Sequence, residues 1–323
     1  MNRSGVAFGW VAVALVLAGC ATGADARDTP AAGSPALASG PAPTHAAPSP
    51  TIRSAAPRPT RTATPRPSAH SSTPPTVAPR SVAAPASIAQ RAAAAVTYAN
   101  RHGMTSGVAV LDTRTGTLYR AGNADGYYAG ASVVKTLIAT RLLLERKMSG
   151  NVEALATKMI EQSDNAAAWT LYPRVGRDGL LPWVQAHYGI HIGAPPTMPG
   201  IWGSTQISAR GLVRFYAAVR HDPRVWPWLA RTMHAYHSRS SSGEPNAFGI
   251  AVAAPSSAVK NGWDTNRDVK APTNAIIDTT GFVQGDRYAV AILSEGSGSL
   301  YYSGGERVVT AEARLLIARG RVS

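Results

Sequence analysis

The sequence predicts an α+β fold, with a five-stranded antiparallel sheet flanked by helices and an all-α lobe beside it. Two stretches within residues 107–122 flank turn residues and are typical of a β-hairpin. Three further strand-like stretches lie near the C-terminus, within residues 256–295. The residues between these two groups carry apolar side chains at helical spacing. Both ends of the folded part therefore supply one sheet, and a cleft between the sheet and the helical lobe is a natural place for a ligand.

The chain begins with the pattern of an export signal. Arg3 precedes an apolar stretch that runs from residue 6 to 17, and Leu17-Ala18-Gly19-Cys20 follows where cleavage is expected. Small residues directly before the only cysteine resemble the lipobox of bacterial lipoproteins, in which that cysteine becomes the lipid-bearing N-terminus. We therefore expect a signal peptide over residues 1–20 and an extracytoplasmic protein anchored to the cell membrane at Cys20. A plain secretory signal with an incidental cysteine is the alternative.

Residues 21–87 have the composition of a disordered tether. Fourteen of the 24 prolines lie between Pro30 and Pro85, among Ala, Ser and Thr, and the segment contains no Phe, Trp or Tyr. Such a segment cannot bury enough apolar surface to offset the entropy of ordering it. We expect the folded domain to cover residues 88–323. Its core alone must hold it, because one cysteine allows no internal disulfide.

The net charge of +14 raises the question of nucleic-acid binding. The arginines of the tail are spread through proline-rich sequence with no recognition module around them, and export removes most of this possibility. We therefore expect no nucleic-acid partner and a monomer with a solvated basic surface. Weak attraction to anionic lipid or wall polymer is the second interpretation.

The elements of the folded part can be assigned in order from periodicity and turn residues. An alanine-rich helix is expected over residues 88–101, and the hairpin strands over 107–113 and 117–122. Helices are expected over 132–146, 153–162, 165–172, 180–187, 207–220 and 225–234. Strands follow over 256–263, 273–283 and 287–295, and a last amphipathic helix covers about 306–319.

The stretch GASVVKTLIA places Ser132 and Lys135 one helical turn apart in an otherwise apolar run. A serine hydroxyl is a poor nucleophile until a base takes its proton, and a lysine can be that base only if burial or a neighbouring cation lowers its pKa. The alternative is a helix-capping serine followed by a lysine that extends to solvent. The pattern alone does not decide, since Ser257 and Lys260 repeat the same spacing on a probable strand.

Two further motifs follow the first in order. Ser163-Asp164-Asn165 precedes a helix, and Lys260-Asn261-Gly262 lies on a strand. With these three motifs, and with VAVLDTRTG, SVVKTL and GFVQGDRYAVAIL around them, the sequence resembles the serine β-lactamases, especially class A, and the related penicillin-binding D-alanyl-D-alanine peptidases. The resemblance runs from about residue 97 to the C-terminus, and it implies the same α+β fold.

The resemblance also implies catalytic roles. Ser132 would be the acylated nucleophile and Lys135 its general base or proton relay. Ser163 would pass a proton to the leaving nitrogen. Each role has a structural alternative, in which Ser132 and Ser163 only cap helices and Lys135 extends to solvent.

Substrate binding is assigned in the same way. Asn165 would hold the amide side chain of the substrate, and Lys260 would supply positive potential for a substrate carboxylate. Asn261 and Gly262 complete this motif. The backbone N–H groups of the nucleophile and of Trp263 would form the oxyanion hole. The alternative is that Asn165 caps a helix and that Lys260 is an exposed strand lysine.

Three departures from the family pattern change the expected reaction. Class A β-lactamases place a glutamate in a loop after the second motif to activate the water that releases the acyl group, whereas residues 189–206 contain no carboxylate. Between Asn165 and Glu244 the only acidic residues are Asp178 and Asp222. The missing carboxylate predicts slow deacylation. Asn261 stands where the family has a hydroxyl residue, which weakens recognition of a substrate carboxylate. The segment 132–163 is shorter than in class A enzymes, so we expect one wall of the cleft to be open or rebuilt.

Three functions remain open. The first is a serine hydrolase that forms an acyl-enzyme on a cell-wall D-alanyl peptide or a β-lactam and deacylates slowly. The second is a true β-lactamase with a non-standard deacylation base, and the third is a non-catalytic lipoprotein that binds penicillin or peptide. We expect no cofactor and no metal, because the ligand-like histidine spacings, His187 with His191 and His234 with His237, occur without an H-E-x-x-H pattern.

Overall fold

The computed structural model describes residues 86–266 and 274–322. The expected signal peptide, Cys20 and residues 21–85 of the expected tether lie outside the described residues, as does the segment 267–273 between two strands.

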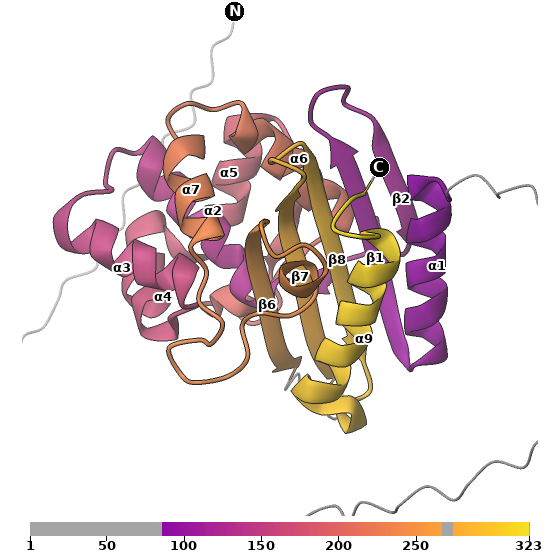
Figure 1. Cartoon of the computed structure of the whole chain (residues 1–323). Coiled ribbons are helices and arrows are strands. Elements are labelled where there is room, and N and C mark those ends of the chain that lie inside the picture. The colour runs from indigo at the N-terminus through magenta and orange to yellow at the C-terminus, as the bar shows by residue number, and fades with distance from the viewer. Residues whose placement is uncertain (1–85, 267–273, 323) are drawn as a thin grey trace, which may run out of the picture. The chain divides into compact units, whose positions relative to one another are not determined.

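The main sheet has five antiparallel strands in the order β2-β1-β8-β7-β6 (Figure 1). The strands are β1 (Met104–Asp112), β2 (Leu118–Gly122), β6 (Ala258–Asn266), β7 (Asn274–Val283) and β8 (Tyr288–Gly296). The first strand of the fold pairs with the last along its whole length, from Met104 opposite Gly296 to Asp112 opposite Tyr288. Both ends of the folded part thus build one sheet, which confirms the fold class predicted from the sequence.

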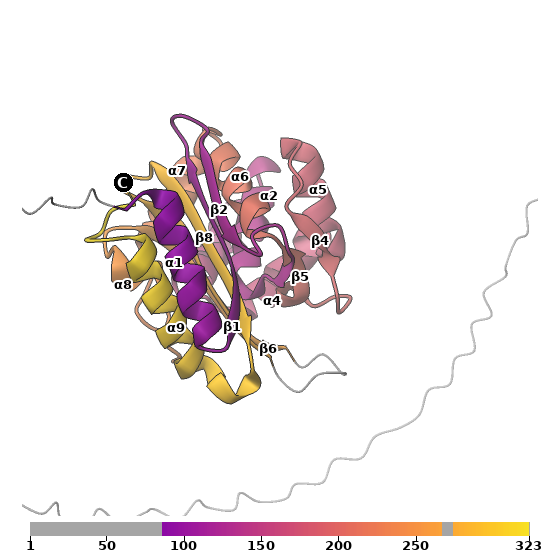
Figure 2. The same cartoon turned by 90° about the vertical axis from the view of Figure 1, so that its right-hand side faces the viewer.

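Helices α1 (Ile88–Arg101) and α9 (Tyr301–Leu316) cover one face of the sheet (Figure 2). The side chain of Ser87 accepts a hydrogen bond from the Gln90 N–H while the Gln90 side chain accepts one from the Ser87 N–H, so a capping box starts α1 where the sequence predicted. The short helix α8 (Ile250–Ala253) lies next to α9. An apolar cluster that includes Val108, Val290 and Ile292 fills the space under these helices.

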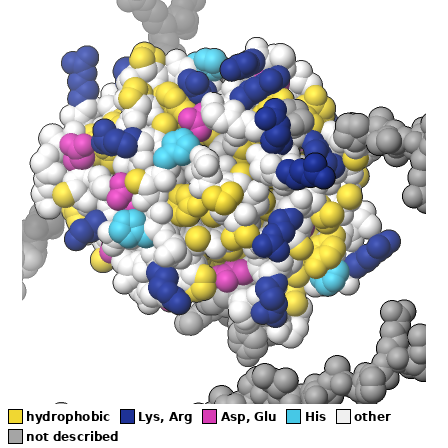
Figure 3. Space-filling model, viewed as in Figure 1, with side chains coloured by type: hydrophobic (Ala, Val, Ile, Leu, Met, Phe, Trp, Pro, Cys, Tyr) yellow, Lys and Arg dark blue, Asp and Glu magenta, His cyan; other side chains and the backbone are white. Residues whose placement is uncertain are grey.

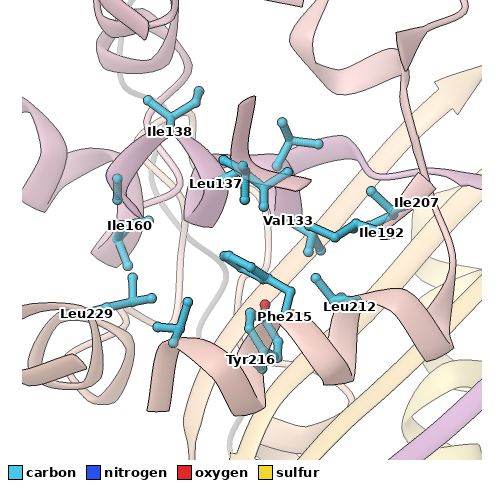
Figure 4. Close-up of a cluster of buried hydrophobic side chains, with 14 of the residues drawn as sticks. Val133, Leu137, Ile138, Ile160, Ile192, Ile207, Leu212, Phe215, Tyr216 and Leu229 are labelled. Carbon is cyan, nitrogen blue, oxygen red and sulfur yellow. The ribbon is translucent and has the colours of Figure 1, made fainter. Parts of the chain in front are cut away.

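The opposite face carries the helical lobe. Its helices are α2 (Lys135–Leu144), α3 (Gly150–Glu161), α4 (Asn165–Leu171), α5 (Leu180–Tyr188), α6 (Ala209–Arg220) and α7 (Trp226–His234). Figure 4 shows Val133 and Leu137 pointing toward Phe215 and Leu212 of α6, in the large apolar cluster between lobe and sheet. This packing holds the start of α2 against the sheet.

Several local elements differ from the sequence expectation. Ser132 does not begin the α-helix, because residues 131–134 form a 3₁₀ turn and α2 starts at Lys135. The helix expected from residue 207 starts at 209, since Ile207 belongs to a strand and Ser208 is the N-cap. That strand, β5 (Thr205–Ile207), pairs with β3 (Tyr128–Ala129) and β4 (Gly193–Pro196) in a small sheet that was not predicted.

The basic residues of the described part are dispersed. In Figure 3, lysine and arginine side chains are distributed around the visible face, with apolar and uncharged side chains between them. Several arginines pair locally with acidic neighbours, as Arg287 does with Asp112 at 2.6 Å. Within residues 86–266 and 274–322, no helix combines the length and apolarity that crossing a membrane requires.

Candidate active site

The 3₁₀ turn that holds Ser132 is tightly constrained. Ala131, directly before the serine, has a φ of +39°, a region that residues with a side chain rarely adopt. On strand β6, Gly262 lies so close to this turn that a Cβ there would be 3.2 Å from the Ser132 nitrogen and 3.2 Å from the Gly130 oxygen. The turn is therefore fixed from two sides, by its own strained backbone and by the sheet.

Lys135 is completely buried, with 0% of its surface exposed. Its Nζ donates to the Ser163 carbonyl at 2.6 Å and to Asn165 Oδ1 at 2.7 Å, and it lies 3.3 Å from Ser163 Oγ. Burial, followed by the nearby charge of Lys260, holds the pKa of Lys135 well below its ordinary value. The alternative interpretation, in which Lys135 extends to solvent, is therefore wrong.

Ser163 lies between the two lysines. Its φ of +52° is again unusual for a residue with a side chain, and it places Oγ 2.9 Å from Lys260 Nζ as well as near Lys135. Lys260 is 1% exposed, not an exposed strand lysine, and burial lowers its pKa to about 7. The N-cap of α4 is Asp164, whose Oδ1 accepts from the Ala167 N–H at 2.7 Å. Neither Ser163 nor Asn165 is therefore the cap.

The charge state of this network follows from its surroundings. Among the described residues, no carboxylate lies within salt-bridge distance of Lys135 or Lys260. A buried amine without a counterion favours its neutral form. The lowered pKa of Lys135 is a property that a general base requires, while the nearby charge of Asp164 acts in the opposite direction.

A cleft of about 270 Å³ lies beside this network. Of the predicted site residues, Ser132, Ser163, Asn165 and Trp263 line it, whereas Lys135, Lys260, Asn261 and Gly262 do not. The other lining residues are Ala131, Trp169, Ile201, Trp202, Gly203, Ser242, Glu244 and Asp264. The structure therefore brings the serine of the first motif, the serine and asparagine of the second and the residue after the third to one surface.

Asn261 does not line the cleft. Its side chain is 1% exposed, and Nδ2 donates to the carbonyls of Asn246 at 3.0 Å and Phe248 at 3.1 Å. Successive side chains of a strand point to opposite faces, so Lys260 and Gly262 face the lobe while Asn261 faces away. Its predicted role in binding substrate directly has no support from this position, whereas it does anchor the loop that contains Asn246.

The loop of residues 189–206, where the resemblance implies the second base of class A β-lactamases, contributes Ile201, Trp202 and Gly203 to the cleft. The Trp202 ring centre lies 4.8 Å from Lys135 Nζ, so an indole occupies the space beside this amine. Asp178 and Asp222 do not line the cleft. Asp178 accepts from the Gly200 N–H of this loop at 2.9 Å, and Asp222 pairs with an arginine.

Two acidic residues that the sequence did not assign to the site, Glu244 and Asp264, also line the cleft. Asp264 is four residues after Lys260 on the same face of β6, so strand alternation could have identified it. Trp169, one helical turn after Asn165, could have been found in the same way. Glu244 lies in an irregular loop, and no periodic signal marks it.

The histidines with ligand-like spacing have ordinary polar contacts. His187, His191, His234 and His237 lie within reach of Arg224, Tyr127, Asp286 and Glu161, respectively. In the part of the chain that the structure describes, no three His, Cys, Asp or Glu residues are grouped so that they could hold a metal ion.

Known structures share this fold. The TLA-1 extended-spectrum β-lactamase matches with a TM-score of 0.55 at 14% identity, over 71% of this chain and 97% of that one. The class A β-lactamase from Mycobacterium abscessus matches with a TM-score of 0.54 at 16% identity, over 70% and 97%. A class A β-lactamase from Bacteroides cellulosilyticus matches with 0.55 at 14% identity, over 73% and 99%. The chain therefore has the class A β-lactamase-like fold.

The curated relatives are named as lipoproteins. "Putative lipoprotein LppW" of Mycobacterium tuberculosis and of Mycobacterium bovis is 36% identical over 174 residues, which are 50% of this chain and 54% of the relative. The chain thus spans about half the length of the curated relatives it matches. No protein-family model matches the sequence.

Proposed function

We propose, from the premise of a class A β-lactamase-like fold, that the chain is a serine hydrolase that forms an acyl-enzyme at Ser132. The substrate would be the amide of a cell-wall D-alanyl peptide or of a β-lactam. One observation carries the proposal: the hydroxyl of Ser163 is held between two buried lysines, Lys135 and Lys260, beside the constrained turn of the nucleophile. Perturbed pKa values next to a cleft are typical of catalytic groups.

The acylation step balances with these groups alone. Ser132 Oγ forms a bond to the substrate carbonyl carbon while its proton passes to the neutral amine of Lys135. Ser163, which contacts both lysines, gives its hydroxyl proton to the leaving nitrogen as the carbon–nitrogen bond breaks, and it receives in exchange the proton that Lys135 accepted. The backbone N–H groups of Ser132 and Trp263 would hold the negative charge that develops on the carbonyl oxygen.

Slow release of the acyl group is part of the proposal. Hydrolysis of an acyl-enzyme needs a base that activates water, and loss of such a base costs ~10²–10⁴ in rate. Trp202, which lies over Lys135 in the loop where class A β-lactamases place that base, offers an apolar ring and no proton acceptor. This feature supports a long-lived adduct.

A β-lactamase with a non-standard base is the second candidate. The observation in its favour is that two carboxylates, Glu244 and Asp264, line the same cleft. A carboxylate can activate water if it comes within hydrogen-bond reach of the acyl carbon through one water molecule.

Intact mass after prolonged incubation with saturating penicillin tests these functions. We expect an adduct of one penicillin that persists and that is absent in Ser132→Ala. Rapid multiple turnover would instead support the β-lactamase. No adduct under any condition would leave a lipoprotein that binds peptide without acylation.

The proposal places this chemistry outside the cytoplasm, with the protein anchored to the cell membrane by lipid at Cys20. The relatives named as lipoproteins support this location. Partition of the full chain into a detergent phase, and its loss in Cys20→Ala, provides the test. Recovery of the wild-type chain in the aqueous phase would contradict the anchor.

A further inference from the structure

The loop of residues 237–248 gives one wall of the cleft a negative charge. Ser242 and Glu244 of this loop line the cleft. Ser241 donates its N–H to the Gln162 carbonyl at 2.9 Å, and Asn261 donates to the Asn246 carbonyl at 3.0 Å. The loop is thus tied to the residue before Ser163 on one side and to the residue after Lys260 on the other, which is the end of the site assigned to the leaving group.

The carboxylate of Glu244 is held in place and ionised. Its Oε2 accepts from Ser242 Oγ at 2.5 Å and from Ser240 Oγ at 2.7 Å, and its backbone N–H donates to Ser240 Oγ at 3.1 Å. These hydroxyls, Ser242 foremost, lower the pKa of Glu244 below its ordinary value. Among the described residues, no lysine, arginine or histidine forms a salt bridge with it.

Among the described residues, this end of the cleft has no cationic side chain that would bind a carboxylate. Within the described part of the chain, no lysine or arginine lines the cleft. Lys260 is 1% exposed, and its Nζ donates hydrogen bonds to Ser163 Oγ at 2.9 Å and to the Asn261 carbonyl at 3.2 Å. The amide of Asn261 is turned to the opposite face. A carboxylate on the leaving group would therefore meet Glu244 without a compensating cation, and a positive charge would be attracted.

We propose that Glu244 is a specificity-determining residue that selects acyl donors whose leaving group carries an ammonium rather than a carboxylate. This inference rests on the proposed acylation of Ser132. The proposed function covers two substrate classes that differ in the charge of the leaving group. In the first class, the leaving group is a terminal D-alanine, which carries a carboxylate. In the second class, it is a residue within a peptide network that carries an ammonium group, and this class is the favoured one.

Three aryl esters of N-acetyl-D-alanine provide the test, with a leaving phenol that carries a meta carboxylate, methoxy or trimethylammonium group. The acyl carbon transfers to Ser132 Oγ, and the serine proton leaves with the phenol. Each rate of phenol release by excess full-length protein is divided by the rate of spontaneous hydrolysis. A full charge several ångströms away, partly screened by water, changes such a rate by about tenfold. We expect the ammonium ester to react about tenfold faster than the carboxylate ester.

Variants assign the effect to one residue. Glu244→Gln should lower the ammonium-to-carboxylate ratio several-fold, with Asp264, the other carboxylate of the cleft, still in place. It should also speed acylation by penicillin, whose leaving nitrogen stands next to a carboxylate-bearing carbon. Asp125→Asn removes a surface carboxylate that does not line the cleft, and it should leave the ratio unchanged. If Glu244→Gln fails to fold, the ratio is measured with the wild-type chain at two salt concentrations. It should fall several-fold between about 0.02 M and about 0.5 M salt, because salt screens the charge of Glu244.

The outcomes separate the two proposals. Equal rates for the three esters, with Ser132 acylated by each, would overturn the specificity and leave the proposed function standing. A ratio that survives in Glu244→Gln would overturn the assignment to this residue. No acylation by any ester would remove the proposed function and this inference with it.

Discussion

Replacing Lys135 by methionine tests whether the buried amine is the base. Methionine retains an unbranched apolar chain of similar length, so the contacts of α2 with the lobe are kept. The variant leaves two acceptors without their donor, the Ser163 carbonyl and Asn165 Oδ1, which lie 2.6 Å and 2.7 Å from Nζ. Each unpaired buried acceptor costs about 1–3 kcal/mol. Removal of an amine that burial disfavours as a cation offsets part of this loss, and we expect a folded variant.

In Lys135→Met, the rate of acylation should fall strongly while the stability of the fold changes little. Loss of a general base costs ~10²–10⁴ in rate, which is about 3–5 kcal/mol of activation free energy. The assay is the rate of penicillin adduct formation by mass, with the melting temperature measured on the same samples. Lys158→Met, which removes an exposed lysine from α3, is the matched control and should change neither quantity. Undiminished labelling in folded Lys135→Met would refute the role of this lysine as the base.

The pH dependence of stability carries a second signature of the same residue. Because the pKa of Lys135 is lower in the folded state than in the unfolded chain, the unfolded chain binds more protons between these two values. Unfolding free energy of the wild type should therefore rise with pH in this window, and the contribution is lost as pH falls through the folded-state pKa. Lys260, with a pKa of about 7, adds a rise from about pH 7 to about 10. Lys135→Met should retain only the part due to Lys260, and an identical slope would contradict the burial of a titrating amine.

Three further predictions concern the turn, the lobe and the domain boundary. Gly262→Ala would place a Cβ 3.2 Å from the Ser132 nitrogen, so acylation should drop by about tenfold or more with little loss of folding, and an unchanged rate would show that the turn can shift freely. Asp178→Ala removes the acceptor of the Tyr172 hydroxyl and of the Gly200 N–H, and should lower the unfolding free energy by about 2 kcal/mol in urea denaturation. Limited proteolysis should leave a resistant fragment that starts near the capping box at Ser87, and a comparably protected tail would contradict this boundary.

The strands and long helices could be predicted because their signals are periodic and local. Helix α1 begins and ends where its alanine-rich pattern predicted, and the turn at residues 284–286 joins two strands as expected. The small sheet of β3, β4 and β5 was missed because strands of two to four residues carry no readable alternation. The 3₁₀ turn at Ser132 was read as the first turn of the helix, because both conformations place residues three apart on one side.

The site was predictable as a set of motifs but not as a geometry. Ser163 contacts Lys135 and Lys260, and Ser132 lines the same cleft as Ser163, whereas the roles that the resemblance implied stay predictions. The left-handed backbone at Ser163, which sets its hydroxyl between the lysines, has no sequence signature in a residue other than glycine. The orientation of Asn261 could have been deduced, since Lys260 and Gly262, directly before and after it in the strand, were already assigned to the site and successive side chains point to opposite faces.

The pairing of β1 with β8 sets the order in which the candidate site can be completed during synthesis. The turn that contains Ser132 packs against Gly262 of β6, and β6 joins the sheet only through β7, so this side of the site forms only after the last strands have been synthesised. Pairings between residues so distant in sequence form late and slowly. A nascent chain that has reached α7 already contains Ser132 and Lys135 but lacks Lys260 and the strand behind the turn. Its serine should stay inert, and reactivity should appear only when the final strands have emerged.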